Sequence, residues 1–138
     1  MSYDRRPPTR YIIPQVNFAA GASRYIRGPL GKGGVLVDYG VFDVTTAFTA
    51  TTTAGTMSVG KAGTPAAYGA ALSMGTTAPA DGGKSVLSSS RPNDAAYNAL
   101  MTLRSIPPDT PILLTAVAPT GGTPAGVASM FVDVIWED

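Results

Sequence analysis

Residues that usually carry out catalysis near neutral pH are scarce in this chain of 138 residues, which contains no cysteine and no histidine. It therefore lacks thiol nucleophiles, disulfide bonds, the commonest zinc ligands and the usual general base of a catalytic triad. We expect no metal and no cofactor. The groups that remain for chemistry are carboxylates, hydroxyls and lysines.

Two segments match catalytic or phosphate-binding motifs in part. Ser58 and Lys61 have the Ser-x-x-Lys spacing of an acyl-transferring pair, which needs a helix to bring the lysine beside the hydroxyl. The glycines and threonines around them instead predict a strand and a turn. In GPLGKGG, Ile26 precedes the segment where a phosphate loop needs its first glycine, and Gly33 stands where it needs serine or threonine. We expect no catalytic residue in either segment.

Three aspartates, Asp38, Asp43 and Asp133, lie in segments that we expect to be strands. Two of them could meet in space as the acid pair of a glycoside hydrolase. A lone aspartate in a strand is more often on the solvent face or bonded to a neighbouring backbone group. We favour this second interpretation, so the sequence predicts a protein that is not an enzyme.

Strand signals dominate the rest of the chain. Residues 35–44, 112–117 and 127–136 are rich in β-branched and apolar residues and are bounded by Gly/Pro turns, and TMSVG (residues 56–60) is a further candidate. The last segment is apolar on both faces, so we expect it to be covered on both sides and central in its sheet. It forms either a hairpin with 112–117 or a pair of strands that cross between sheets.

Other segments complete the expected fold. Pro14 predicts an edge strand or a bulged one. One short helix is expected at 93–103, where cap-type residues precede apolar positions at helical spacing, and a turn of helix at 65–71. The prediction is a mainly β single domain over 11–138, either a β-sandwich or a jelly-roll-like β-barrel, after an extended arm over 1–10.

Charge is unevenly placed along the chain. Up to Lys32 there are six basic residues and one acid, whereas after Arg104 there are four acids and no base. This asymmetry fits solvated ends, head-to-tail complementarity between subunits, or a docked arm. The basic residues lie among prolines and not on one helix face, so we expect no nucleic-acid binding. No apolar run approaches the ~20 residues of a membrane span, so we expect no membrane partner.

The arm at the start of the chain is rich in arginine and proline. A segment this polar cannot bury enough apolar surface to fold against its own domain. Its prolines favour an extended conformation, and its arginines offer forked donors to carboxylates. We predict that it extends along a neighbouring subunit, with six partner-binding residues: Arg5, Arg6, Pro7, Pro8, Arg10 and Tyr11.

The segment KGGVLVDYGVFDVTTAFTATTTAGTMSVG, the ending IPPDTPILLTAVAPTGGTPAGVASMFVDVIW and the Arg/Pro-rich start resemble the small head decoration (cement) proteins of tailed bacteriophages. The resemblance extends from about residue 11 to residue 136. It implies a β subunit, often trimeric, that binds the major capsid protein on the outer face of the virion after assembly in the host cytoplasm, and it brings no catalytic residues.

Alternatives from other classes stay open. The chain could be another phage structural subunit, such as a head–tail connector, a tail protein or a fibre-base protein. It could also be a β-sandwich module that binds a carbohydrate or another ligand, or a hydrolase that uses carboxylates.

Overall fold

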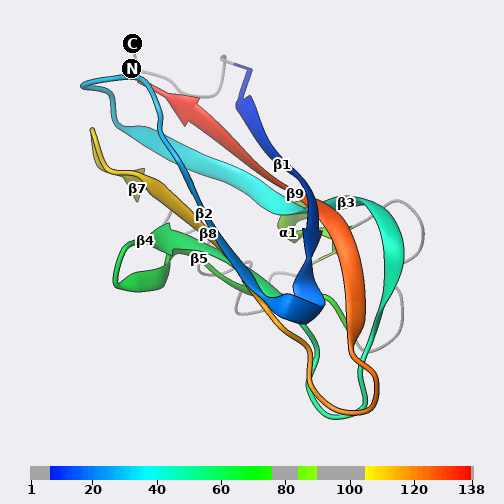
Figure 1. Ribbon diagram of the computed structural model, residues 1–138. Helices are drawn as coiled ribbons and strands as arrows, with labels where there is room; N and C mark the ends of the chain where they lie inside the picture. The colour runs from blue at the N-terminus through cyan, green and yellow to red at the C-terminus, as the bar shows by residue number, and fades with distance from the viewer. Residues whose placement is uncertain (1–6, 76–83, 90–104, 138) are drawn as a thin grey trace.

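The computed structural model describes residues 7–75, 84–89 and 105–137 and forms two antiparallel sheets packed face to face (Figure 1). Sheet I has the strand order β1-β9-β3-β6, with β7 also paired to β3, and sheet II has the order β2-β8-β4-β5. Sheet I contains β1 (Thr9–Asn17), β3 (Gly34–Thr49), β6 (Lys84–Ser85), β7 (Ser105–Ile106) and β9 (Ala125–Trp136). Sheet II contains β2 (Ala22–Ile26), β4 (Thr56–Lys61), β5 (Thr64–Ser73) and β8 (Ile112–Val117). A 3₁₀ turn (Phe18–Ala20) and the short helix α1 (Val86–Ser89) complete the described elements.

The mainly β prediction is confirmed. β8 has the bounds expected from the sequence, and the strand expected at 35–44 forms part of the longer β3. The last strand, β9, lies between β1 and β3, so it is the central strand that its two apolar faces predicted.

The chain crosses between the sheets after β8. Since β8 belongs to sheet II and β9 to sheet I, residues 118–124 form a crossing loop and not the turn of a hairpin. This loop runs beside residues 50–55, which carry the chain from β3 to β4. Thr52 N donates to Thr120 O, and Thr120 N donates to Thr53 O, both at 3.0 Å. The two crossings therefore support each other at one end of the sandwich.

Pro14 lies in an edge strand that is also bulged, as the sequence predicted. β1 is the outer strand of sheet I, and its register with β9 shifts between Ile13 and Val16. Gln15 has a φ of 48° at this shift, a conformation uncommon for residues other than glycine. A bulge at an edge strand limits pairing with other chains.

Two expectations differ from the structure or lie outside it. The turn of helix expected at 65–71 is wrong, because this segment pairs with β4 as part of β5. Gly69 permits that pairing, since a Cβ there would lie 2.5 Å from Cε1 of Tyr39 in the facing sheet. The helix expected at 93–103 lies outside the described residues.

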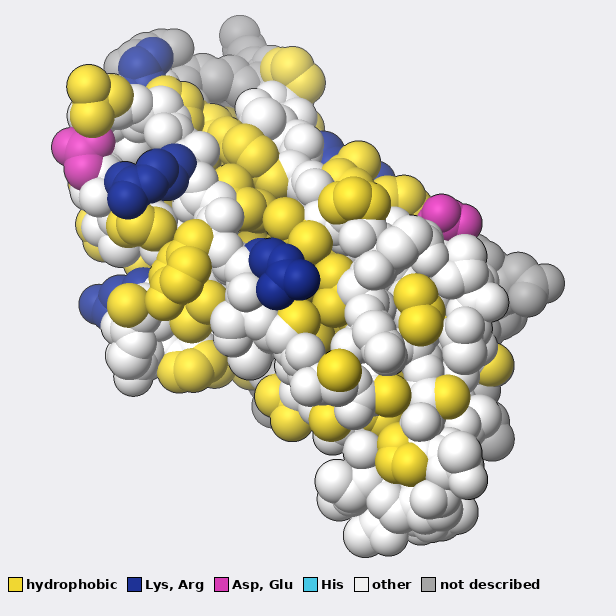
Figure 2. Space-filling model, in the orientation of Figure 1, with side chains coloured by type: hydrophobic (Ala, Val, Ile, Leu, Met, Phe, Trp, Pro, Cys, Tyr) yellow, Lys and Arg dark blue, Asp and Glu magenta, His cyan; other side chains and the backbone are white. Residues whose placement is uncertain are grey.

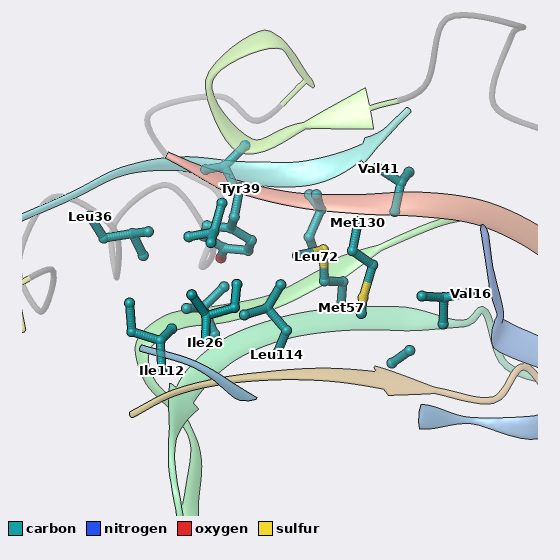
Figure 3. Close-up of a cluster of buried hydrophobic side chains, with 14 of the residues drawn as sticks. Val16, Ile26, Leu36, Tyr39, Val41, Met57, Leu72, Ile112, Leu114 and Met130 are labelled. Carbon is teal, nitrogen blue, oxygen red and sulfur yellow. The ribbon is translucent and has the colours of Figure 1, made fainter. Parts of the chain in front are cut away.

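The core fills the space between the two sheets (Figure 3). Side chains from both layers interdigitate there, and the largest fully buried ones include Leu36, Tyr39, Met57, Leu114 and Met130. Burial raises the pKa of Tyr39 far above its ordinary value, and its hydroxyl donates to the carbonyl oxygen of Ala70. One buried core thus joins the two sheets.

Candidate functional site

Two of the three aspartates identified in the sequence come together in sheet I. Asp38 on β3 is directly opposite Asp133 on β9, whereas Asp43 lies further along β3. Asp38 and Asp133 are buried, at 9% and 7% exposure. Val132 and Val134 belong to the core, so by strand alternation Asp133 lies on the opposite face of sheet I. The structure therefore places a carboxylate pair on the outer face of this sheet.

Asp133 is engaged by an arginine of the same chain. Arg10 on β1 donates from Nε to Oδ1 at 2.7 Å and from its terminal NH2 nitrogen to Oδ2 at 2.8 Å. This guanidinium also lies over the ring of Phe131, 4.1 Å from its centroid. The hydrogen bond with Asp133 raises the pKa of Arg10. The forked pair thus fastens the edge strand β1 to the central strand β9.

Asp38 accepts hydrogen bonds from backbone groups, which is the role that we favoured for a lone strand aspartate. Its Oδ1 accepts from Tyr39 N at 2.9 Å and from Leu87 N at 3.1 Å. Burial raises the pKa of Asp38, against the lowering effect of these bonds and of the Ser85 side chain, and repulsion from Asp133 raises it further. Asp38 therefore holds α1 against sheet I at the cost of burying a charge.

An Asp38→Asn variant tests this cost through its pH dependence. Because the folded pKa of Asp38 lies above its unfolded value, its contribution to stability is fully present below the unfolded pKa and is lost as pH rises through the folded pKa. Asparagine keeps an acceptor oxygen but does not ionise. We expect the free energy of unfolding of the variant, relative to wild type, to rise between acid and neutral pH. Urea unfolding at several pH values measures this, and parallel profiles would contradict it.

Asp43 belongs to a separate polar cluster on the outside of sheet I. Gln15 Nε2 donates to both O and Oδ2 of Asp43 at 3.1 Å, and Thr45 Oγ1 donates to Gln15 Oε1 at 2.6 Å. Gln15 N also donates to Ser129 Oγ at 3.2 Å. Gln15 and Asp43 both have positive φ, at 48° and 49°. The cluster therefore stabilises two irregular strand positions on either side of β9.

Ser58 and Lys61 do not form a catalytic pair. Both lie in β4, where Ser58 is buried and Lys61 is exposed at the end of the strand. Residues three apart in a strand point to opposite faces. The strand predicted around them therefore separates the hydroxyl from the amine.

Arg10 and Tyr11 belong to the sandwich and not to the arm. β1 begins at Thr9, whose register partner is Val134, because the free edge of β9 offers backbone pairing to these residues. Trp136 Nε1 donates to Tyr11 Oη at 3.0 Å, and the two rings meet edge to face at 6.5 Å. The first strand thus begins two residues before the boundary expected after residue 10. Both side chains have partners within their own chain.

The remaining arm residues are placed differently. Pro7 and Pro8 are exposed and precede the first strand. Arg5 and Arg6 lie outside the described residues. The arm as the structure defines it thus ends at Pro8, at the end of the sandwich where β9 also ends (Figure 1).

A hollow of about 130 Å³ lies at this same end of the sandwich, and we call it the Trp136 hollow. It is lined by two loops and the last strand: Arg27, Gly28, Pro29, Leu30, Lys32, Pro107, Asp109, Thr110, Pro111 and Trp136. Leu30 is 91% exposed at its rim. Figure 2 shows one face, on which the basic and acidic side chains lie in the upper and middle parts of the molecule and the lower end carries no charged side chain.

Hydrogen bonds to backbone groups hold the loop over 27–33 in place. Gly31 N donates to Asp109 Oδ1 and Gly33 N donates to Glu137 Oε1, both at 2.6 Å. A Cβ at Gly28 would overlap the ring of Trp136, so glycine is required for this close approach. Hydrogen bonds and this close contact therefore fix the shape of the Trp136 hollow.

This hollow was not predicted from the sequence. The signals were present: Leu30 is an apolar residue inside a Gly-rich turn, and three prolines lie close together at 107, 108 and 111. A leucine in a turn has no core to enter, which is a reason to expect a surface role. The convergence of two loops with the end of β9 requires the three-dimensional structure.

Within the described part of the chain, no three or more acidic side chains lie together as a possible metal site. No described helix is long and apolar enough to cross a membrane. No protein-family model matches the chain, and neither a curated protein nor a solved structure matches it.

Proposed function

We propose that this protein is a structural virion subunit, a decoration (cement) protein that binds the outer surface of a phage head and stabilises contacts between capsomers. The observation that supports this most is the exposed Leu30 beside the Trp136 hollow, at the end where the Arg/Pro arm begins. Together they offer a protein partner one apolar anchor and a site for one of its own side chains. The hollow, at about 130 Å³, is smaller than the roughly 300–1,000 Å³ of small-molecule pockets. A protein partner suits it better.

The engagement of the candidate catalytic groups supports a structural role rather than a hydrolytic one. Asp133 is bonded to Arg10, Asp38 accepts from backbone N–H groups, and Ser58 is separated from Lys61 by the strand geometry. Each carboxylate is thus used to hold one part of the fold to another.

The proposed partner is the major capsid protein, and the proposed assembly is a homo-oligomer, with a trimer favoured. A shell presents many identical sites, so modest contacts by many copies become collectively strong. The arm is expected to reach a neighbouring subunit, either another copy or the capsid protein beneath.

Titration of undecorated capsids with the purified protein tests the proposal. We expect binding that saturates at a fixed ratio to capsid protein, measured by co-sedimentation. Binding to isolated tails or connectors in place of heads would indicate a different virion subunit. Binding to glycans without capsids would indicate a carbohydrate-binding module, and either result would overturn the proposal.

Deleting residues 2–6 should weaken attachment to capsids by about tenfold, since it removes two arginines whose ion pairs contribute up to ~1 kcal/mol each. The deletion spares β1, which begins at Thr9. Full-length binding should fall with rising salt, and the truncated form should be less sensitive to salt. Co-sedimentation across a salt series measures both.

A double variant with Arg24→Gln and Lys61→Gln is the control for basic groups, because it removes two positively charged side chains, as the truncation does, at exposed sites elsewhere on the sandwich. If it lost as much attachment as the truncation, general charge and not the arm would explain the effect. Equal occupancy of the truncated and full-length forms at every salt concentration would leave the arm without a role in attachment.

A further inference from the structure

The arm and the Trp136 hollow lie at the same end of the sandwich. β1 begins at Thr9, which is opposite Val134 in the register, and Trp136 follows two residues later on β9. Tyr11 on β1 is hydrogen-bonded to Trp136 itself. A chain that leaves β1 at Pro8 therefore starts close to the hollow.

The lining of the hollow suits a proline-rich segment. Pro29, Pro107, Pro111 and Trp136 contribute rings, and Leu30 contributes an exposed aliphatic side chain. Extended proline segments dock in aromatic-lined grooves, because they are already ordered and lose little entropy on binding. The sequence Arg-Arg-Pro-Pro over residues 5–8 is such a segment. We propose that this segment of one copy binds the Trp136 hollow of a second copy.

The direction of the chain favours binding to the hollow of a second copy over binding to the hollow of the same copy. Pro7 and Pro8 are exposed and are not among the residues that line the hollow. Two consecutive prolines keep themselves and the preceding residue extended. We therefore expect the segment to continue outward from β1 instead of reversing, in which case four residues at about 3.1 Å each would reach about 12 Å beyond Thr9.

The charges at the rim set the orientation of the bound segment. Asp109, which lines the hollow, and Glu137, which follows Trp136 in the chain, each use one carboxylate oxygen to accept from a glycine N–H, and among the described residues the other oxygen has no hydrogen-bond partner. Each remaining oxygen can accept a charge-assisted hydrogen bond from Arg5 or Arg6. Arg27 and Lys32 also lie around the hollow and repel arginine. We expect the prolines over Trp136 and the arginines toward the carboxylates.

The chain contains one tryptophan, so the emission of Trp136 reports on the hollow directly. The experiment measures this emission and the sedimentation mass of the full-length protein across a dilution series without capsids, so it does not depend on the proposed function. We expect the emission to shift to shorter wavelength as the mass rises, because a docked segment shields the indole from water. Both changes should have the same midpoint concentration.

Variants of the arm and of the rim give the specific test. Arg5→Glu with Arg6→Glu should raise the midpoint about tenfold or more, whereas Arg24→Glu with Lys61→Glu, a control of equal net charge, should raise it much less. Asp109→Asn removes the charge, keeps the acceptor for Gly31 N–H and suits the φ of 56° at this position. It should raise the midpoint about threefold.

A synthetic peptide of residues 1–9 separates hollow occupancy from association. Added in excess, it should lower the mass to that of one copy while Trp136 keeps its short-wavelength emission. Mass that rises with no change in emission would place the interface elsewhere and overturn the inference. A protein that stays monomeric at every concentration would also overturn it. So would a short-wavelength emission that does not depend on concentration but is lost in the arm variants, because the arm would then dock in its own hollow.

Discussion

Replacing Phe48 by alanine should lower the free energy of unfolding by about 3–5 kcal/mol. The ring is fully buried and packs edge to face on Phe18, with centroids 5.0 Å apart. It also lies directly against the backbone of β9, since a Cβ at Gly126 would overlap it. These neighbours belong to β9 and to a 3₁₀ turn, which cannot collapse into the space that the ring leaves. A cavity would therefore remain.

Urea unfolding of the Phe48→Ala variant measures this loss. Thr46→Ala is the control, because this exposed side chain is on the same strand and should change stability by less than about 0.5 kcal/mol. A loss of under about 1 kcal/mol for Phe48→Ala would mean that the 3₁₀ turn is not packed on β3 and β9 as described. Domains of this size have only about 5–15 kcal/mol in total, so the expected loss is a large part of it.

Most of the strands could be predicted from the local pattern of apolar residues and turn residues. β8 and β9 are apolar runs between Gly/Pro turns, and both are strands. Pro14 marked an edge strand because it lacks the N–H that a central position needs. These features depend on a few neighbouring residues, so the sequence alone is enough to predict them.

Features that depend on the register between strands could not be predicted from the sequence. Asp38 and Asp133 are 95 positions apart along the chain, and only the pairing of β3 with β9 makes them neighbours. Arg10 was assigned to a partner-binding arm because the segment around it is polar and rich in arginine and proline. Its actual partner, Asp133, becomes available only because the free edge of β9 accepts Thr9 and the residues that follow. Composition could not reveal that edge.

The segment over 65–71 shows how tertiary pairing overrides local signals. Its alanines and the leading proline suit a helix start. The open edge of β4 offers backbone hydrogen bonds along the segment instead, and Gly69 makes room for Tyr39 beneath it. Gly69 would weaken a helix because it lacks a side chain. In the sheet, the same lack of a side chain lets the two sheets pack closely.

The hydrogen bonds of polar groups on the outer face of sheet I indicate where a binding surface is to be expected. Arg10, Asp38 and Asp133 hold β1 and α1 against the sheet, so the outer face of sheet I has a stabilising role. Leu30, 91% exposed beside the Trp136 hollow, has no such role. The end of the sandwich that carries them is therefore where we expect changes to alter binding without altering the fold.

Replacing Gly40 by alanine should destabilise the protein by about 1–3 kcal/mol or more, through overpacking against backbone. The added Cβ would overlap the carbonyl oxygen of Lys84 and lie 2.7 Å from Cα of Ser85. Neither atom can move aside as a side-chain end could. The pairing of β6 with β3 must open, and Val86, which is fully buried just after β6, would lose its position. Chemical unfolding measures the loss.

The sign of the stability change in Gly40→Ala distinguishes a steric overlap in the folded protein from an entropy effect in the unfolded chain. Gly40 is not among the described positive-φ residues, so with free space around it alanine should stabilise by about 0.4–1 kcal/mol through lower entropy of the unfolded state. Gly63→Ala is the complementary control, because its φ is 81° and no atom lies within 4 Å of the added Cβ. It should cost about 1–2 kcal/mol from backbone conformation alone. A Gly40→Ala variant as stable as wild type would show that β6 is not seated on β3, and that the backbone bond from Leu87 to Asp38 does not hold α1 in place.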